Sequence, residues 1–173
     1  IGFDRAVLRD AFRIGLPAGI QSTMYGISNL LIQGGINTFG TETVAAWTAY
    51  SKIDSLFWMV INAFGISVTT FVSQNFGARK LDRMRASVRT GYALAMGATA
   101  LASLIFGLFA EPILSVFSED EAVLRTGVTL IHEITPLYFT YVSIEILSGA
   151  LRGVGESLVP MLMTVFGICA LRI

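Results

Sequence analysis

The sequence predicts an all-α integral membrane protein, a polytopic bundle of about five transmembrane helices. The chain of 173 residues is 54% hydrophobic and only 14% charged, whereas soluble domains are roughly a quarter charged. Uncharged runs at 14–41, 55–78 and 90–110 each reach the roughly 20 residues that a spanning helix needs. A soluble helical bundle, the alternative, would show a charged face on every helix, and these runs do not.

The predicted elements follow one another with short connections. The basic segment 1–13 has helical spacing and is expected to lie along the cytoplasmic membrane surface, or else to be a linker. Spans are expected at about 14–38, 44–76, 86–110, 123–151 and 157–173. The acidic cluster at 119–121 suits the start of the helix that includes the fourth span, and Pro136 is expected to kink it. Because the sequence begins at Ile1 and stops inside an apolar run, it is expected to be part of a longer protein.

Basic residues are distributed unevenly among the connections. Lys and Arg occur in 1–13, in 77–89 and at Arg152, but not in 37–43 or 111–121. Because cytoplasmic loops of membrane proteins are enriched in Lys and Arg, the loops near 1–13, 77–89 and 152–157 are predicted to be cytoplasmic. The expected location is the cell (plasma) membrane, crossed several times.

The composition argues against several function classes. Lys+Arg and Asp+Glu both number 12, so no net charge attracts nucleic acid. One Cys and one His give little basis for a disulfide framework, a metal site or a catalytic set. No phosphate-binding glycine loop is present, so ATP-driven transport by this chain itself is not expected. No cofactor is predicted.

A polar stripe follows the first predicted span. Its members occur at every fourth residue, which places them on one slowly winding side of a helix: Gln21, Tyr25, Asn29, Gln33 and Asn37. Lipid cannot satisfy such groups, so they must face other helices or water. They either form hydrogen bonds between helices or line a hydrated substrate cavity.

The second span carries two charged residues of opposite sign. Asp54 shares a helix face with Trp58 and Asn62, whereas Lys52 is displaced by about 200°. Counted from Thr43, Asp54 is expected roughly 16 Å deep at 1.5 Å per residue. Ionisable residues inside a membrane often mark ion or substrate paths, so Asp54 has either a transport role or a structural partner. Lys52 is expected to meet a carboxylate or carbonyls of another helix, or to snorkel.

The third span carries a line of small residues, also four apart: Gly91, Ala95, Thr99, Ser103 and Gly107. Small side chains let helix backbones approach closely, so this line is predicted to be a packing seam. It is assigned no chemistry.

In the fourth span Tyr138, Tyr141, Glu145 and Arg152 lie along one side. Glu145 and Arg152 are seven residues apart and nearly superposed after two helical turns. They are expected to form a salt-linked gate or anchor, or an interfacial ion pair of little consequence.

Three stretches in order, FRIGLPAGIQ, FVSQNFGARK and GALRGVGES, make the chain resemble the MATE (multidrug and toxic compound extrusion) family along nearly its whole length. The resemblance implies twelve helices in two six-helix lobes. This chain is similar to helices 7–11 of the second lobe, so the missing N-terminal lobe of the same protein is an expected partner.

The resemblance also implies secondary active efflux of amphipathic or cationic organic compounds in antiport with H⁺ or Na⁺, without enzymatic activity. Acidic sites that some members carry on the seventh and tenth helices fall here on Tyr25 and Tyr141, which leaves Asp54 and Glu145 to titrate. The alternatives are a lipid or lipid-linked oligosaccharide flippase, a membrane-embedded enzyme and a structural membrane subunit. The predicted transport-pathway residues are Gln21, Tyr25, Asn29, Lys52, Asp54, Asn62, Tyr141 and Glu145.

Overall fold

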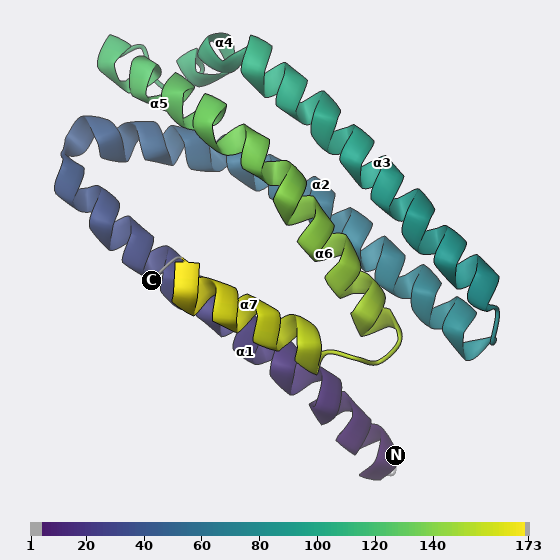
Figure 1. Ribbon diagram of the computed structural model, residues 1–173. Coiled ribbons are helices and arrows are strands. Elements are labelled where there is room, and N and C mark those ends of the chain that lie inside the picture. Colours follow the sequence, from purple (N-terminus) through teal and green to yellow (C-terminus); the bar gives the residue numbers. More distant parts are fainter. Residues whose placement is uncertain (1–4, 172–173) are drawn as a thin grey trace, which may run out of the picture.

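A computed structural model describes residues 5–171, which form helices joined by short connections (Figure 1). The helices are α1 (Arg5–Ile36), α2 (Thr41–Gly77), α3 (Leu81–Leu108), α4 (Ala110–Ser115), α5 (Glu121–Ile134), α6 (Tyr138–Gly153) and α7 (Leu158–Leu171), with single 3₁₀ turns η1 (Asn37–Phe39) and η2 (Thr135–Leu137). Residues 5–171 contain no strand. The all-α class predicted from the sequence is therefore confirmed.

Three helical segments of the described chain are long and apolar enough to cross a membrane: Thr41–Gly77, Leu81–Leu108 and Glu121–Gly153. The sequence predicts five spans. The first and the last of these do not reach the length and hydropathy of the other three. Gln21, Asn29 and Gln33 lower the hydropathy of α1, although its 32 residues are long enough. The apolar part of the last helix, Leu158–Gly167, is shorter.

The fourth predicted span is bent at the proline. α5 and α6 meet at η2, which contains Pro136, and in Figure 1 they run as one bent rod. Proline lacks the backbone N–H that a continuous helix needs at this point, which explains the bend. The acidic start of α5 is also confirmed, because the Asp120 side chain accepts hydrogen bonds from the backbone N–H groups of Ala122 and Val123.

The core lies where α2 packs against α3, α5 and α6. One cluster of buried residues joins α2, α3 and α6 and includes Phe57, Ile61, Ala95, Val142 and Ile146. A second cluster joins α2 to α4 and α5. Burial of these side chains stabilises the four helices as one bundle.

Glycines bring α2 and α6 into backbone contact. A Cβ added to Gly149 would lie 2.9 Å from the Gly65 carbonyl oxygen, and one added to Gly153 would lie 2.8 Å from that of Thr69. Neither distance leaves room for a side chain. The Thr69 hydroxyl lies in this crossing and donates to the carbonyls of Gly65 and Gly149, both at 2.9 Å. Small residues thus allow the close approach expected of membrane helices.

The predicted seam of small residues on α3 is confirmed over most of its length. Ala95 and Thr99 are fully buried, and a Cβ on Gly91 would collide with the Val68 side chain of α2. Gly107, at the other end of the line, has open space around it. The seam therefore ends before Gly107.

α1 and α7 form a separate pair. α7 lies beside the middle part of α1 and contacts it there (Figure 1). The Gln21 amide of α1 donates to the Thr164 hydroxyl of α7 at 2.7 Å, and the Ser157 hydroxyl donates to the Arg13 carbonyl at 3.2 Å. α1 is continuous from Arg5, so it contains both the described end of the basic segment 1–13 and the first expected span.

Candidate functional site

The Asp54 side chain lies at the junction between α2 and the bend of α5 and α6. Its Oδ1 accepts a hydrogen bond from the Tyr138 hydroxyl at 2.6 Å and a longer one from the Tyr50 hydroxyl at 3.2 Å. Its Oδ2 accepts from the Trp58 Nε1–H at 2.9 Å. Tyr50 and Trp58 are one helical turn on either side of Asp54, whereas Tyr138 is the first residue of α6.

Aromatic rings enclose this carboxylate. Tyr50 and Tyr138 are only 3% and 6% exposed, and their hydroxyl oxygens are 3.0 Å apart. Phe57 stacks on the Tyr138 ring at a centroid distance of 3.8 Å. Within residues 5–171, no Lys or Arg forms an ion pair with Asp54. A half-buried carboxylate thus has neutral donors as its partners.

A second acidic residue is linked to the first through aromatic side chains. The Trp58 ring lies 4.0 Å from the Tyr141 ring, and the Tyr141 hydroxyl donates to Glu145 Oε2 at 3.4 Å. Glu145 Oε1 accepts from Arg152 Nη2 at 2.7 Å. The side chains of Arg152 and Glu145 are 24% and 15% exposed. The ion pair expected from the seven-residue spacing is therefore present and partly buried.

The two carboxylates differ in what they can do. Glu145 is neutralised by Arg152, so protonating it would leave a partly buried cation without its partner. Asp54 has no such counter-ion in the described chain. Because an ionised carboxylate only accepts hydrogen bonds and a protonated one also donates, a proton on Asp54 changes its bonding to all three partners.

The length of α2 changes the expected depth of Asp54. The helix has 37 residues and is therefore about 55 Å long, nearly twice the hydrocarbon thickness of a bilayer. A count from its first turn then overestimates depth, because part of the helix must protrude. The uncharged run that begins at Ser55 favours a position of Asp54 nearer one edge of the hydrocarbon than the predicted middle, and the depth of Asp54 stays a prediction.

The structure brings Asp54, Tyr141 and Glu145 into one connected group, and Tyr25 of α1 lies within interaction distance of the Tyr141 hydroxyl. Four of the eight predicted pathway residues therefore come together. Their roles in transport stay predictions.

The other predicted residues lie elsewhere. Gln21 holds α7 through Thr164. Asn62 is exposed, and its amide donates to the Trp58 carbonyl of its own helix at 3.0 Å. Asn29 is also exposed, and Lys52 is exposed on the opposite side of α2 from Asp54.

Tyr50 takes part in the cluster although it is absent from the predicted pathway residues, as are Trp58, Tyr138 and Arg152. A sequence signal existed for three of these four. Tyr50 and Trp58 stand four residues before and after Asp54, a spacing at which helical side chains meet, and Arg152 has the seven-residue spacing to Glu145. The contact of Tyr138 with Asp54 depends on how α6 docks on α2, which spacing within one helix does not specify.

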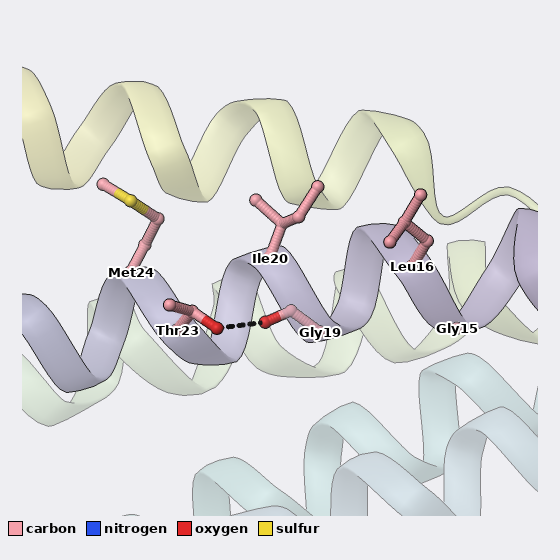
Figure 2. A pocket seen from close by; sticks show the side chains of 6 residues that line it. All are labelled: Gly15, Leu16, Gly19, Ile20, Thr23 and Met24. Carbon is pink, nitrogen blue, oxygen red and sulfur yellow. Dashed lines mark hydrogen bonds between the residues drawn. The ribbon is translucent and has the colours of Figure 1, made fainter.

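A shallow hollow of about 350 Å³ on α1 is a weaker candidate (Figure 2). It is lined by Gly15, Leu16, Gly19, Ile20, Thr23 and Met24. The Thr23 hydroxyl already donates to the Gly19 carbonyl at 2.9 Å, and none of the six residues is ionisable. Across residues 5–171, no group of three His, Cys, Asp or Glu side chains could hold a metal ion. The Asp54 cluster is therefore the candidate site.

Long apolar helices packed through glycines, with a half-buried carboxylate between them, define a multi-pass α-helical membrane protein. The particular family follows from comparison with known proteins. The MatE family model matches residues 17–173, and the chain belongs to this family.

Similar proteins agree with this assignment. The chain is 25% identical over 170 residues to the probable multidrug resistance protein YoeA of Bacillus subtilis, covering 98% of this chain and 37% of that protein. It is 30% identical to the multidrug resistance protein PmpM of Pseudomonas aeruginosa, covering 94% of this chain and 34% of PmpM. The chain thus spans about a third of the length of these relatives.

A solved structure supports the same fold. The crystal structure of a MATE protein in complex with MaL6 superposes with a TM-score of 0.87, covering 96% of this chain and 38% of that one. The sequence identity is 18%, so this likeness concerns the fold alone.

Proposed function

We propose that this chain is part of a secondary active transporter that exports amphipathic or cationic organic compounds in antiport with H⁺ or Na⁺. Membership of the MatE family and the names of the relatives support export of drugs. The observation that supports coupling of export to an ion is the Asp54 carboxylate. Three neutral donors hold it where α2 meets the bend of α5 and α6.

Proton binding at Asp54 would loosen the tie between α2 and α6. The ionised carboxylate accepts from the Tyr138 hydroxyl at 2.6 Å, and hydrogen bonds to charged groups are about twice as strong as neutral ones. A bound proton removes that advantage and makes Asp54 itself a donor. The weakened contact lies at the first residue of α6, next to the turn with Pro136, where the backbone bends most easily.

The same geometry favours H⁺ over Na⁺ as the coupling ion at this site. The oxygens of Asp54, Tyr50 and Tyr138 already lie at hydrogen-bonding distances of 2.6 to 3.2 Å from one another. A hard metal ion needs several oxygens around it, so Na⁺ would have to push these groups apart. A proton needs no such rearrangement.

Exchange with the substrate would follow from competition for the charge of Asp54. A cationic compound near the ionised carboxylate stabilises the charged form, whereas a proton neutralises it. Asp54 therefore favours either the cationic compound or the proton at any one time. Antiport requires that the two bind alternately. Rocking of this bundle against the rest of a longer protein would then expose the site to each side in turn.

A flippase for lipid-linked oligosaccharides, the runner-up, is less well supported. Such a substrate carries a pyrophosphate, which calls for a cationic cavity. Here Arg152 is neutralised by Glu145, and Lys52 lies on the opposite face of α2 from the Asp54 cluster. We propose no enzymatic activity and no cofactor.

We place the protein in the cell membrane, with the loops near 1–13, 77–89 and 152–157 on the cytoplasmic side. The excess of Lys and Arg in these segments supports this orientation. Asp54 would then lie near the external end of α2, where it can exchange protons with the outside.

Replacement of Asp54 tests the proposal. The full-length protein with Asp54→Asn is reconstituted into vesicles, and drug efflux is measured with proton and sodium gradients imposed separately. We expect gradient-driven efflux to fall at least tenfold (about 1.4 kcal/mol in the coupled step) while the protein still folds, because Asn keeps the size of Asp but cannot titrate.

Asp82→Asn is the matched control, since this carboxylate is fully exposed on α3 and should leave efflux unchanged. Efflux by Asp54→Asn that still responds to both gradients like the wild type would reduce Asp54 to a structural role.

A further inference from the structure

An apolar groove of about 560 Å³ lies between α2, the end of α3 and α4. Exposed large side chains line it, among them Leu56, Ile105, Phe109 and Val116, which are 42 to 80% exposed. Lys52 is the ionisable residue of the lining. The volume is within the range of small-molecule sites, so the groove can hold more than solvent.

The Lys52 ammonium has no ion-pair partner within residues 5–171, where the salt bridges are Arg85–Asp82 and Arg152–Glu145. Lys52 is exposed and the other residues of the lining are apolar, so an anion bound in the groove can reach its ammonium. The groove thus combines an apolar surface with one positive charge that no carboxylate within residues 5–171 neutralises.

The position along α2 places Lys52 at the edge of the hydrocarbon. The uncharged run 55–78 measures about 36 Å as a helix, which already exceeds the roughly 30 Å of a bilayer core. Lys52 comes three residues before this run, and it lines the groove together with Ile105, near the end of α3, and Pro112 of α4. Lipid phosphates lie at this level of a membrane.

The groove also opens away from the proposed transport site. Lys52 and Asp54 are two residues apart and therefore point about 200° from each other around α2. The Asp54 side chain faces α6, whereas Lys52 faces the groove beside α3 and α4. A ligand here would not occupy the Asp54 cluster.

We propose that this groove binds an anionic phospholipid, with its phosphate on the Lys52 ammonium and an acyl chain along Leu56 and Ile105. Lys binds phosphate as a compact point charge, and the apolar lining matches an acyl chain. A zwitterionic headgroup carries its own ammonium beside the phosphate, so it competes with Lys52. A lipid with net negative charge is therefore preferred.

The test uses the full-length protein in detergent, with phosphatidylglycerol or phosphatidylcholine added in increasing amounts. Bound lipid is counted by native mass spectrometry, and the thermal midpoint is followed in parallel. We expect the wild type to bind phosphatidylglycerol at least fivefold more tightly than phosphatidylcholine. Lys52→Gln should lose this preference, and Lys52→Arg should keep it.

Two further variants separate the groove from charge in general. Lys80→Gln removes the other lysine of the chain, which lies at the opposite end of α2, and should leave the preference unchanged. Leu56→Trp fills the groove without removing charge and should weaken binding of both lipids.

The proposal is overturned if the wild type binds both lipids equally, or if Lys52→Gln keeps the preference for phosphatidylglycerol. It is also overturned if Lys80→Gln abolishes this preference as completely as Lys52→Gln does. Drug efflux is not part of this readout. Failure here therefore leaves the role of Asp54 untouched.

Discussion

The bundle of α2, α3, α5 and α6 and the pair of α1 and α7 are held together by different means. In the bundle, Gly65, Gly149 and Gly153 allow backbones to touch, and two clusters of buried residues fill the remaining space. In the pair, individual hydrogen bonds such as Gln21 to Thr164 join helices whose glycines have open space around them.

This difference indicates which part of the chain is rigid and which depends on further contacts. Among the residues of α1 whose burial is described, Pro17 and Ser28 are buried, whereas nine residues of α2 are buried. Tight packing supports the Asp54 cluster in the bundle, because a hydrogen-bonded site needs fixed neighbours. The looser pair suits a segment that moves or that other parts of a longer protein cover.

Replacing a contact glycine should break the bundle most strongly. Gly149→Leu would place side-chain atoms against the Gly65 carbonyl, and overpacking of this kind costs about 1–3 kcal/mol or more. We expect the thermal midpoint of the purified full-length protein to fall by several degrees. Gly34→Leu on α1, where a Cβ meets nothing within 4 Å, is the matched control and should not lower it. Equal losses in both variants would contradict the contrast between the two regions.

Removing the partly buried ion pair should have a smaller effect on the bundle. Glu145→Gln replaces the carboxylate that accepts from Arg152 at 2.7 Å with a neutral amide, and the loss of charge in this partly exposed pair costs about 1 kcal/mol. Chemical or thermal unfolding measures the change. Asp82→Asn, which removes an exposed pair with Arg85 at 3.7 Å, should change stability little. A double variant with Arg152→Gln should lose less than the two single variants together, and additive losses would argue against direct coupling.

Disrupting the pair of α1 and α7 should have the smallest effect. Gln21→Leu removes the hydrogen bond to Thr164, and interhelical hydrogen bonds in membranes contribute about 0.6 kcal/mol on average. We expect a small fall in the thermal midpoint, compared with no change for Gln74→Leu on an exposed part of α2. A loss as large as that of Gly149→Leu would show that the pair is as tightly held as the bundle.

Much of the fold could be predicted from the sequence. Uncharged length and small residues at every fourth position predict membrane helices and their seams, because lipid requires internally satisfied backbones and close packing needs small side chains. The bend at Pro136 and the start of α5 at Asp120 also follow from local chemistry. The short helix α4 was missed, since its six residues lie in a connection with no periodic pattern.

The candidate site could be predicted only in part. Spacing within one helix groups Tyr50, Asp54 and Trp58, and it pairs Glu145 with Arg152. It does not reveal that Tyr138 reaches Asp54 from 84 residues away, nor that Gln21 turns to α7 instead of a cavity. These contacts depend on the relative rotation of whole helices.

The sequence by itself determined the all-α class, the order of the long helices α1, α2 and α3 and of the bent segment of α5 and α6, and the faces that carry polar groups, because hydropathy and helical periodicity are local properties. Only the tertiary structure decided which polar groups meet. Asp54 receives the Tyr138 hydroxyl from α6, Gln21 donates to Thr164 of α7 and Lys52 faces an apolar groove. The physical reason is that glycine contacts set how closely and at what rotation helices pack, and that rotation selects the partners of every side chain between them.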